Sequence, residues 1–147
     1  MKLKNALSVL ALVCSLVFTS CNKLDEPTLA IPQEIAYTLV AVADSGVSGT
    51  ATFTKEENGS SHVLIELNNS NTTTNPAFIN FNSASEGGDV AITLTACECS
   101  VSNTTITQFD NGETIAYEGL VTLNGHITIL DETGHIVAVA DIGSNSN

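Results

Sequence analysis

Apolar residues recur at every second position over many short stretches of this chain, which is the pattern of β-strands with one buried face. In 89–96 the recurring residues are Val90, Ile92 and Leu94, and we expect all three to face inward. Applied along the chain, the pattern predicts eight strands. They are 35–43, 49–54, 62–67, 77–81, 89–96, 104–108, 125–130 and 136–142.

Turn-forming residues separate the expected strands. Asn58-Gly59 and Asp110-Asn111-Gly112 supply the residues that tight turns favour, and 131–134 is expected to close a final hairpin. The stretch 117–123 has no clear period and is interpreted as a short helical turn. Seven or eight short strands at this spacing predict an all-β fold, an antiparallel β-sandwich or barrel.

The first residues have the pattern of an export signal. Lys2 and Lys4 precede a nearly continuous apolar run from 6 to 17, which is too short to span a bilayer but suits a signal peptide. The run ends at Thr19-Ser20-Cys21, which resembles the lipobox of bacterial lipoproteins. That resemblance implies that Cys21 is acylated and becomes the first residue after cleavage. An ordinary signal peptide with an incidental cysteine is the alternative.

These features divide the chain into four parts. Residues 1–20 are expected to be the lipoprotein signal peptide, 21–33 a lipidated tether, 34–143 the β-domain and 144–147 a polar tail. The tether contains Lys23-Leu24-Asp25-Glu26 just behind the cysteine, which resembles the surface-export signal of Bacteroidetes lipoproteins. We therefore expect a cell-envelope protein in the outer membrane, with its domain exposed at the surface.

The net charge of the chain limits the classes of molecule that it can bind. The chain has sixteen acidic residues and four lysines, a formal charge of −12. Without residues 1–20 only Lys23 and Lys55 would remain, and the formal charge would be −14. Proteins that bind nucleic acid neutralise phosphates with lysine and arginine, so a nucleic-acid partner is excluded. The membrane is expected to be reached through the lipid on Cys21.

Five segments together are similar to the CHRD (chordin-type) domain in its bacterial lipoprotein form, over roughly residues 35–143. The segments are 49–53, 75–80, 86–94, 110–118 and 125–143. The resemblance implies an immunoglobulin-like sandwich or Greek-key barrel, with a faint similarity to copper/zinc superoxide dismutase. The family has no established general activity, so the resemblance implies a fold rather than a reaction.

This chain departs from the CHRD pattern where metal ligands would be sought. The family usually has His-x-His after a Pro-Ala pair, and Phe78-Ile79-Asn80 stands there instead. Two histidines spaced in this way share one face of a strand and can share a metal. Phe78 cannot ligate a metal, and the Asn80 amide is a poor ligand. His126 replaces a family tyrosine.

The remaining candidate chemistry is dispersed along the sequence. His62, His126 and His135 lie in separate segments, and a ligand pair of His126 and His135 is the weaker alternative to histidines at strand ends. Cys97 and Cys99 leave three interpretations open. They form a local disulfide, remain two thiols, or ligate a metal with a nearby histidine or acid.

Acidic residues cluster in the expected loops. The set is Glu86, Asp89, Asp110, Glu113, Asp131 and Glu132. Solvated turn acids are favoured over a calcium site, because no stretch has the spacing of a calcium-binding loop. Motifs of serine hydrolases, phosphate-binding loops and dinucleotide-binding folds are missing from the sequence as well.

These observations predict a lipid-anchored envelope module that binds or supports other molecules, without enzymatic activity, cofactor or metal. Its ligand is unknown, and a protein or glycan at the cell surface is the expected partner. An adhesin-like role is one variant of this prediction. The alternative from another class is a metal-binding or redox-active protein with a dismutase-like fold that uses Cys97, Cys99 and a histidine.

Overall fold

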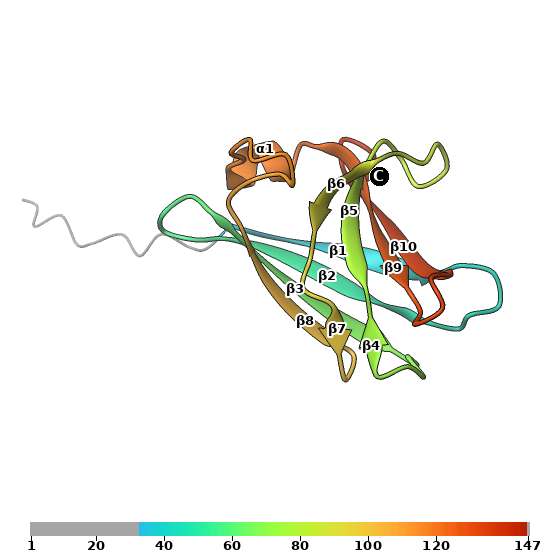
Figure 1. Cartoon of the computed structure of the whole chain (residues 1–147). Coiled ribbons are helices and arrows are strands. Elements are labelled where there is room, and N and C mark those ends of the chain that lie inside the picture. The colour runs from blue at the N-terminus through green and yellow to red at the C-terminus, as the bar shows by residue number, and fades with distance from the viewer. Residues whose placement is uncertain (1–32, 147) are drawn as a thin grey trace, which may run out of the picture. The chain divides into compact units, whose positions relative to one another are not determined.

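The computed structural model describes residues 33–146, as ten strands and one short helix (Figure 1). The signal segment, Cys21 and the tether therefore lie outside the described residues, except for Gln33. The elements are β1 (Glu34–Ala41), β2 (Ser48–Lys55), β3 (Ser61–Asn68), β4 (Thr74–Asn75), β5 (Ala77–Phe81), β6 (Val90–Thr93), β7 (Cys97–Glu98), β8 (Val101–Ile106), α1 (Tyr117–Leu120), β9 (Asn124–Leu130) and β10 (Ile136–Gly143).

All strand pairings are antiparallel, and the strands form two layers. The first sheet has the order β4-β7-β8-β3-β2-β1, and the second has the order β1-β10-β9-β5-β6. The first strand belongs to both sheets because its early residues pair with β2 and its last two pair with β10. The predicted all-β antiparallel fold, a sandwich or barrel, is confirmed.

The chain crosses between the sheets at a proline. β4 pairs with β7 in the first sheet, and β5 pairs with β9 in the second. Pro76 stands between them and has no N–H to offer a ladder, while its carbonyl oxygen accepts a bond from the Leu130 N–H at 2.9 Å. A second crossing, between β6 and β7, lies beside the first, where the Leu94 N–H donates to the Ala77 carbonyl oxygen at 3.0 Å.

The inner faces of the two sheets form one hydrophobic core. Alternation along each strand supplies it, as on β2, where Ala51 and Phe53 are buried between outward threonines. The Phe53 ring packs edge-on against the Tyr37 ring, with 5.1 Å between the ring centres. The largest fully buried apolar side chains are Phe53, Leu39, Ile65, Ile79, Ile106, Leu120, Ile127, Ile129 and Ile142.

The helix closes one end of this core. α1 is a single turn over Tyr117–Leu120, as the unclear period of 117–123 predicted, and it buries its first and last side chains. The Tyr117 N–H donates to the Gly59 carbonyl oxygen at 3.2 Å. Lys55 of β2 forms an ion pair with Glu118. Two contacts thus tie the helix to the β2–β3 hairpin.

Three details of the sequence prediction are wrong. The strand count is ten rather than seven or eight, because β4 and β7 are two-residue strands made by the crossings. Val90 faces solvent, since a bulge makes it pair with Asn80 while Ile92 pairs with Ile79. The first strand ends at Ala41 instead of residue 43, where Ala43 turns the chain with a φ of 49°.

Candidate functional site

The two cysteines lie on opposite sides of a tight turn. Cys97 is fully buried in β7, whereas Cys99 is exposed, and both are free thiols in the structure. Cys99 and Ser100 have φ values of 49° and 74° and join Glu98 to its partner Val101. Two successive positive φ values are the signature of a two-residue hairpin turn. The local disulfide considered from the sequence is therefore not formed here, because the chain reverses at Cys99 and carries its thiol away from the core.

Burial also controls the reactivity of Cys97. Desolvation in the core raises the pKa of its thiol to about 11, because a thiolate would have to form away from water. A thiol that stays protonated is a poor nucleophile and a poor metal ligand. The Cys97 side chain therefore contributes to packing rather than to redox chemistry.

We expect alkylation to distinguish the two thiols. Iodoacetamide at pH 8 should modify Cys99 in the native protein and reach Cys97 only after unfolding in urea, as located by peptide mass analysis. The reason is the difference in burial, which leaves only Cys99 in contact with reagent. If neither thiol reacted before a reductant was added, the two would be joined in a disulfide and this assignment would be wrong.

The histidines occupy separate positions on the two sheets. His126 of β9 lies opposite Asp141 of β10, while His135 lies in the turn at the other end of the same hairpin. About five residues of strand separate these positions, which is about 16 Å. His62 lies on β3 of the first sheet, between Thr54 and Thr105. The weaker sequence hypothesis, a ligand pair of His126 and His135, is contradicted by this separation.

His126 lies next to Asn80 in the second sheet. It is buried and pairs with Asn80 across β5 and β9. Its Nδ1 lies 2.8 Å from the Asn82 carbonyl oxygen, an acceptor, so Nδ1 donates a proton in this bond. Sequence analysis did not predict this pairing of His126 with Asn80, because the two residues lie far apart along the chain. The pairing offers one imidazole and one amide, which is short of the three or four ligands that zinc or copper requires.

Most of the candidate acids are engaged in turns. Asp110 accepts from the Thr93 N–H at 2.9 Å and from the Thr93 hydroxyl at 2.7 Å, and so caps the open edge of β6. Glu86 and Glu132 accept similar pairs of bonds from Ser83 and Thr73. Between residues 33 and 146, no three His, Cys, Asp or Glu side chains come close enough to hold a metal ion. The acids act here as local structural acceptors.

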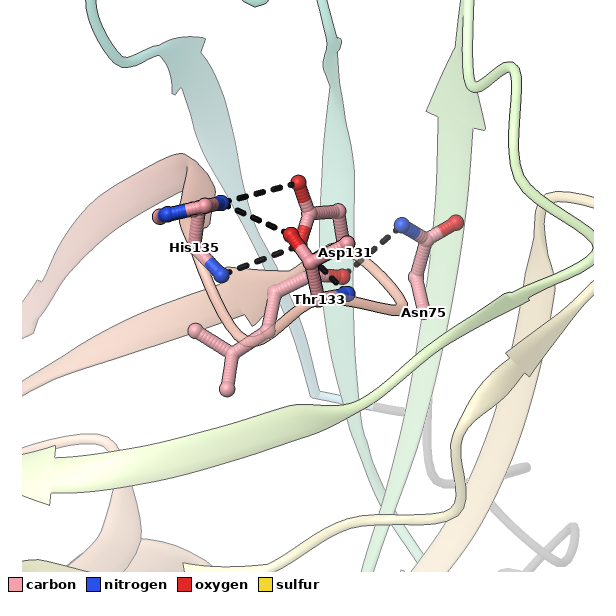
Figure 2. A network of polar contacts seen from close by, with 5 residues as sticks. Asn75, Asp131, Thr133 and His135 are labelled. Atoms are coloured by element: carbon pink, nitrogen blue, oxygen red, sulfur yellow. Dashed lines mark hydrogen bonds and ion pairs between the residues drawn. The ribbon is translucent and has the colours of Figure 1, made fainter.

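Asp131 organises the turn between β9 and β10 (Figure 2). Its Oδ1 accepts from the Thr133 N–H at 2.8 Å, the Thr133 hydroxyl at 2.7 Å and the His135 N–H at 2.9 Å. The Thr133 hydroxyl bond, followed by the His135 N–H bond, lowers the pKa of the Asp131 carboxyl to about 2. Hydrogen bonds to the charged form produce such a shift, because they stabilise the carboxylate.

We expect the stabilising effect of Asp131 to depend on pH. A lowered pKa in the folded state stabilises the fold fully above the ordinary value of 3.8, and this contribution is lost as pH falls through about 2. Asp131→Asn should therefore lower the thermal midpoint at pH 7, and the effect should shrink progressively as pH falls from 3.8 toward 2. Scanning calorimetry from pH 7 to pH 2 measures the difference. Asp44→Asn, at another acidic turn residue, is the control, and an equal pH dependence in both variants would contradict this role.

Sequence analysis did not predict a surface hollow that lies beside β1. Only Val40 and Ala41 of β1 pair with β10, and the two strands diverge from there toward α1 (Figure 1). The space between them is a groove of about 460 Å³, walled by β1, β10 and the residues Asn145 and Ser146. A neighbouring hollow of about 370 Å³ continues past Ile35 to α1. We call the two together the β1 groove.

Comparison with known proteins adds no relative. No protein-family model, curated protein or solved structure matches the chain. The similarity to the CHRD domain therefore stays a prediction. Within residues 33–146, the structure also has no helix with the length and hydropathy to cross a bilayer.

Proposed function

We propose that this protein is a lipid-anchored module of the bacterial cell envelope that binds another molecule and catalyses no reaction. The observation that carries the anchor is Cys21, placed directly after a short apolar segment that follows two lysines. Two or more acyl chains hold a protein stably on a membrane, whereas one chain does so only marginally. The CHRD resemblance and an outer-membrane, surface-exposed location belong to the same proposal.

Binding is favoured over catalysis by the distribution of reactive groups. A catalytic site needs a nucleophile, base or metal ligand set within hydrogen-bonding reach. Here the buried thiol of Cys97 is hard to ionise, and His126 and His135 lie at opposite ends of a hairpin. In contrast, the β1 groove offers an extended concave surface beside unpaired main chain. That surface suits recognition.

We expect Cys21→Ser to abolish lipidation and membrane retention. In a diderm bacterium fed radiolabelled palmitate, the wild-type chain should carry label and partition into the detergent phase of Triton X-114. The serine variant should lose both properties, because a hydroxyl cannot form the thioether to diacylglycerol.

Cys14→Ser is the matched control, since this cysteine lies in the segment expected to be removed. It should leave both label and partitioning unchanged. Equal labelling of the Cys21→Ser variant would refute the proposed anchor.

A further inference from the structure

Within residues 33–146, one edge of β1 has no neighbouring strand over most of its length. Residues Glu34–Leu39 pair with β2, but the register with β10 covers only Val40 and Ala41. Sheet edges present unpaired N–H and C=O groups that can accept another strand. This edge differs from an ordinary exposed one because it lies in the β1 groove.

The direction of the main-chain groups follows from two hydrogen bonds. The Lys55 N–H donates to the Gln33 carbonyl oxygen at 2.8 Å, so Gln33 directs its polar groups toward β2. Because these groups alternate in an antiparallel strand, those of Ala36 and Thr38 point the other way, into the groove. The Val42 N–H donates to the Val137 carbonyl oxygen at 3.0 Å, so the main-chain groups of Val42 point toward β10. By the same alternation, those of Thr38 and Ala36 also point to the β10 side and into the groove.

The opposite wall of the groove presents a second free edge. Val137 and Val139 direct their main-chain groups toward β1 where the strands meet, so Asp141 does the same where they have diverged. The Tyr37 side chain seals the core beneath this opening, where its hydroxyl accepts from the Gly143 N–H at 3.3 Å. The groove therefore has a closed floor between two edges that both retain hydrogen-bonding capacity.

Side chains around the groove define the chemistry of an occupant. Ile35 and Val40 line it and are 39% and 54% exposed, so the groove presents apolar surface to an occupant. Glu34, Glu118 and Asp141 also line it. Lys55 is the only lysine or arginine in the described part of the chain, and it is paired with Glu118. An apolar surface edged by acids favours a ligand with alternating apolar and basic side chains.

We propose that the β1 groove takes up an extended peptide of a partner protein as an added strand, through main-chain bonds to β1 and basic side chains opposite its acids. Strand addition derives affinity from the main chain and specificity from alternate side chains. Charge favours a basic peptide over a second copy of this chain, because the copy would carry the same excess of acidic residues. The inference rests on the proposed function, since it names the class of molecule that the module binds.

The test uses two fluorescein-labelled peptides and two variants of the full chain in detergent. One peptide alternates valine with lysine over eight residues, and the other alternates valine with glutamate. Ala36→Pro removes an N–H that points into the groove and leaves the β1–β2 ladder intact, since edge positions tolerate proline. Ala36→Val is the matched control, because it keeps the N–H and places an apolar side chain at an exposed position.

Fluorescence anisotropy should show saturable binding of the valine–lysine peptide to the wild-type protein and to Ala36→Val. Loss of one main-chain bond should weaken binding to Ala36→Pro by about fivefold, and the valine–glutamate peptide should not bind. Equal binding to Ala36→Pro and Ala36→Val would show attraction by net charge alone and would overturn the proposal. So would a lack of saturable binding at millimolar peptide.

Hydrogen exchange distinguishes the proposed peptide from two other possible occupants of the groove, a segment of the same chain and a second copy of the protein. In the protein alone, the amides of Ala36 and Thr38 should exchange fast, and they should be protected when the valine–lysine peptide is bound. Protection without peptide at every protein concentration would place a segment of the same chain in the groove. Protection that grows with protein concentration would place a second copy there. Either result would overturn the proposal without bearing on the anchor at Cys21, which the palmitate experiment tests separately.

Discussion

Phe53→Ala is expected to lower the free energy of unfolding by about 3–5 kcal/mol, the usual cost of removing a fully buried phenyl ring. The side chain is inaccessible to solvent and lies on the inner face of β2, which pairs with β1. It also packs edge-on against Tyr37. Since Tyr37 seals the floor of the β1 groove, loss of this contact should loosen the groove as well as the core.

Phe81→Ala is the matched control, because it removes the same atoms from a side chain that is 39% exposed. Phe81 contacts Phe109 with 5.9 Å between ring centres, so its removal should cost less than about 1.5 kcal/mol. Urea denaturation followed by circular dichroism measures both variants. Similar costs for Phe53 and Phe81 would contradict the assignment of Phe53 to the centre of the core.

The positions of most strands could be predicted because alternation is a local property of the sequence. Ala51 and Phe53 of β2 face inward as the pattern of apolar and polar residues requires. Val90 shows the limit of this reasoning. A bulge inserts one residue into β6, so the side chains on one side of it change faces. Nothing in the local pattern of 89–96 indicates where a bulge falls.

The crossings between sheets could not be predicted for a different reason. Pro76 marks a break in the sequence, but whether the chain turns there or passes into another sheet depends on distant partners. Leu130 and Cys97 supply those partners, one on each sheet. The β1 groove also arises from long-range pairing. Residues Glu34–Leu39 of β1 pair with β2, whereas only Val40 and Ala41 pair with β10. Long-range pairing therefore created a concave surface that the sequence analysis did not predict.

The positions of the two cysteines in the β7–β8 hairpin distinguish between chemical states that the sequence left open. Spacing alone left Cys97 and Cys99 open to a disulfide, free thiols or metal ligation. A two-residue turn with positive φ at Cys99 separates them, with one thiol in the core and the other in solvent. Burial then raises the pKa of the Cys97 thiol. Both residues therefore have structural positions in this hairpin, Cys97 in the core and Cys99 in the turn.

Asn75→Ala should destabilise the protein by about 2–4 kcal/mol, although it removes only a small polar side chain. Asn75 is 1% exposed and lies at the crossing between the sheets. Its Nδ2 donates to the Leu130 carbonyl oxygen at 2.8 Å (Figure 2). Its Oδ1 accepts from the Ser70 hydroxyl at 2.6 Å. Alanine would leave the carbonyl oxygen buried without this donor, and a buried polar group without a partner costs about 1–3 kcal/mol.

Asn80→Ala supplies the contrast that makes this prediction specific. Asn80 donates one bond, to the Gly88 carbonyl oxygen at 3.1 Å, and its Oδ1 is buried without a partner among the described residues. Removing it loses one bond and one unsatisfied acceptor, so the net cost should stay below about 1 kcal/mol. Urea denaturation of both variants checks the order. If Asn75→Ala cost no more than Asn80→Ala, the crossing at Pro76 would be held by apolar packing, and the Asn75 bonds would contribute little to joining the sheets.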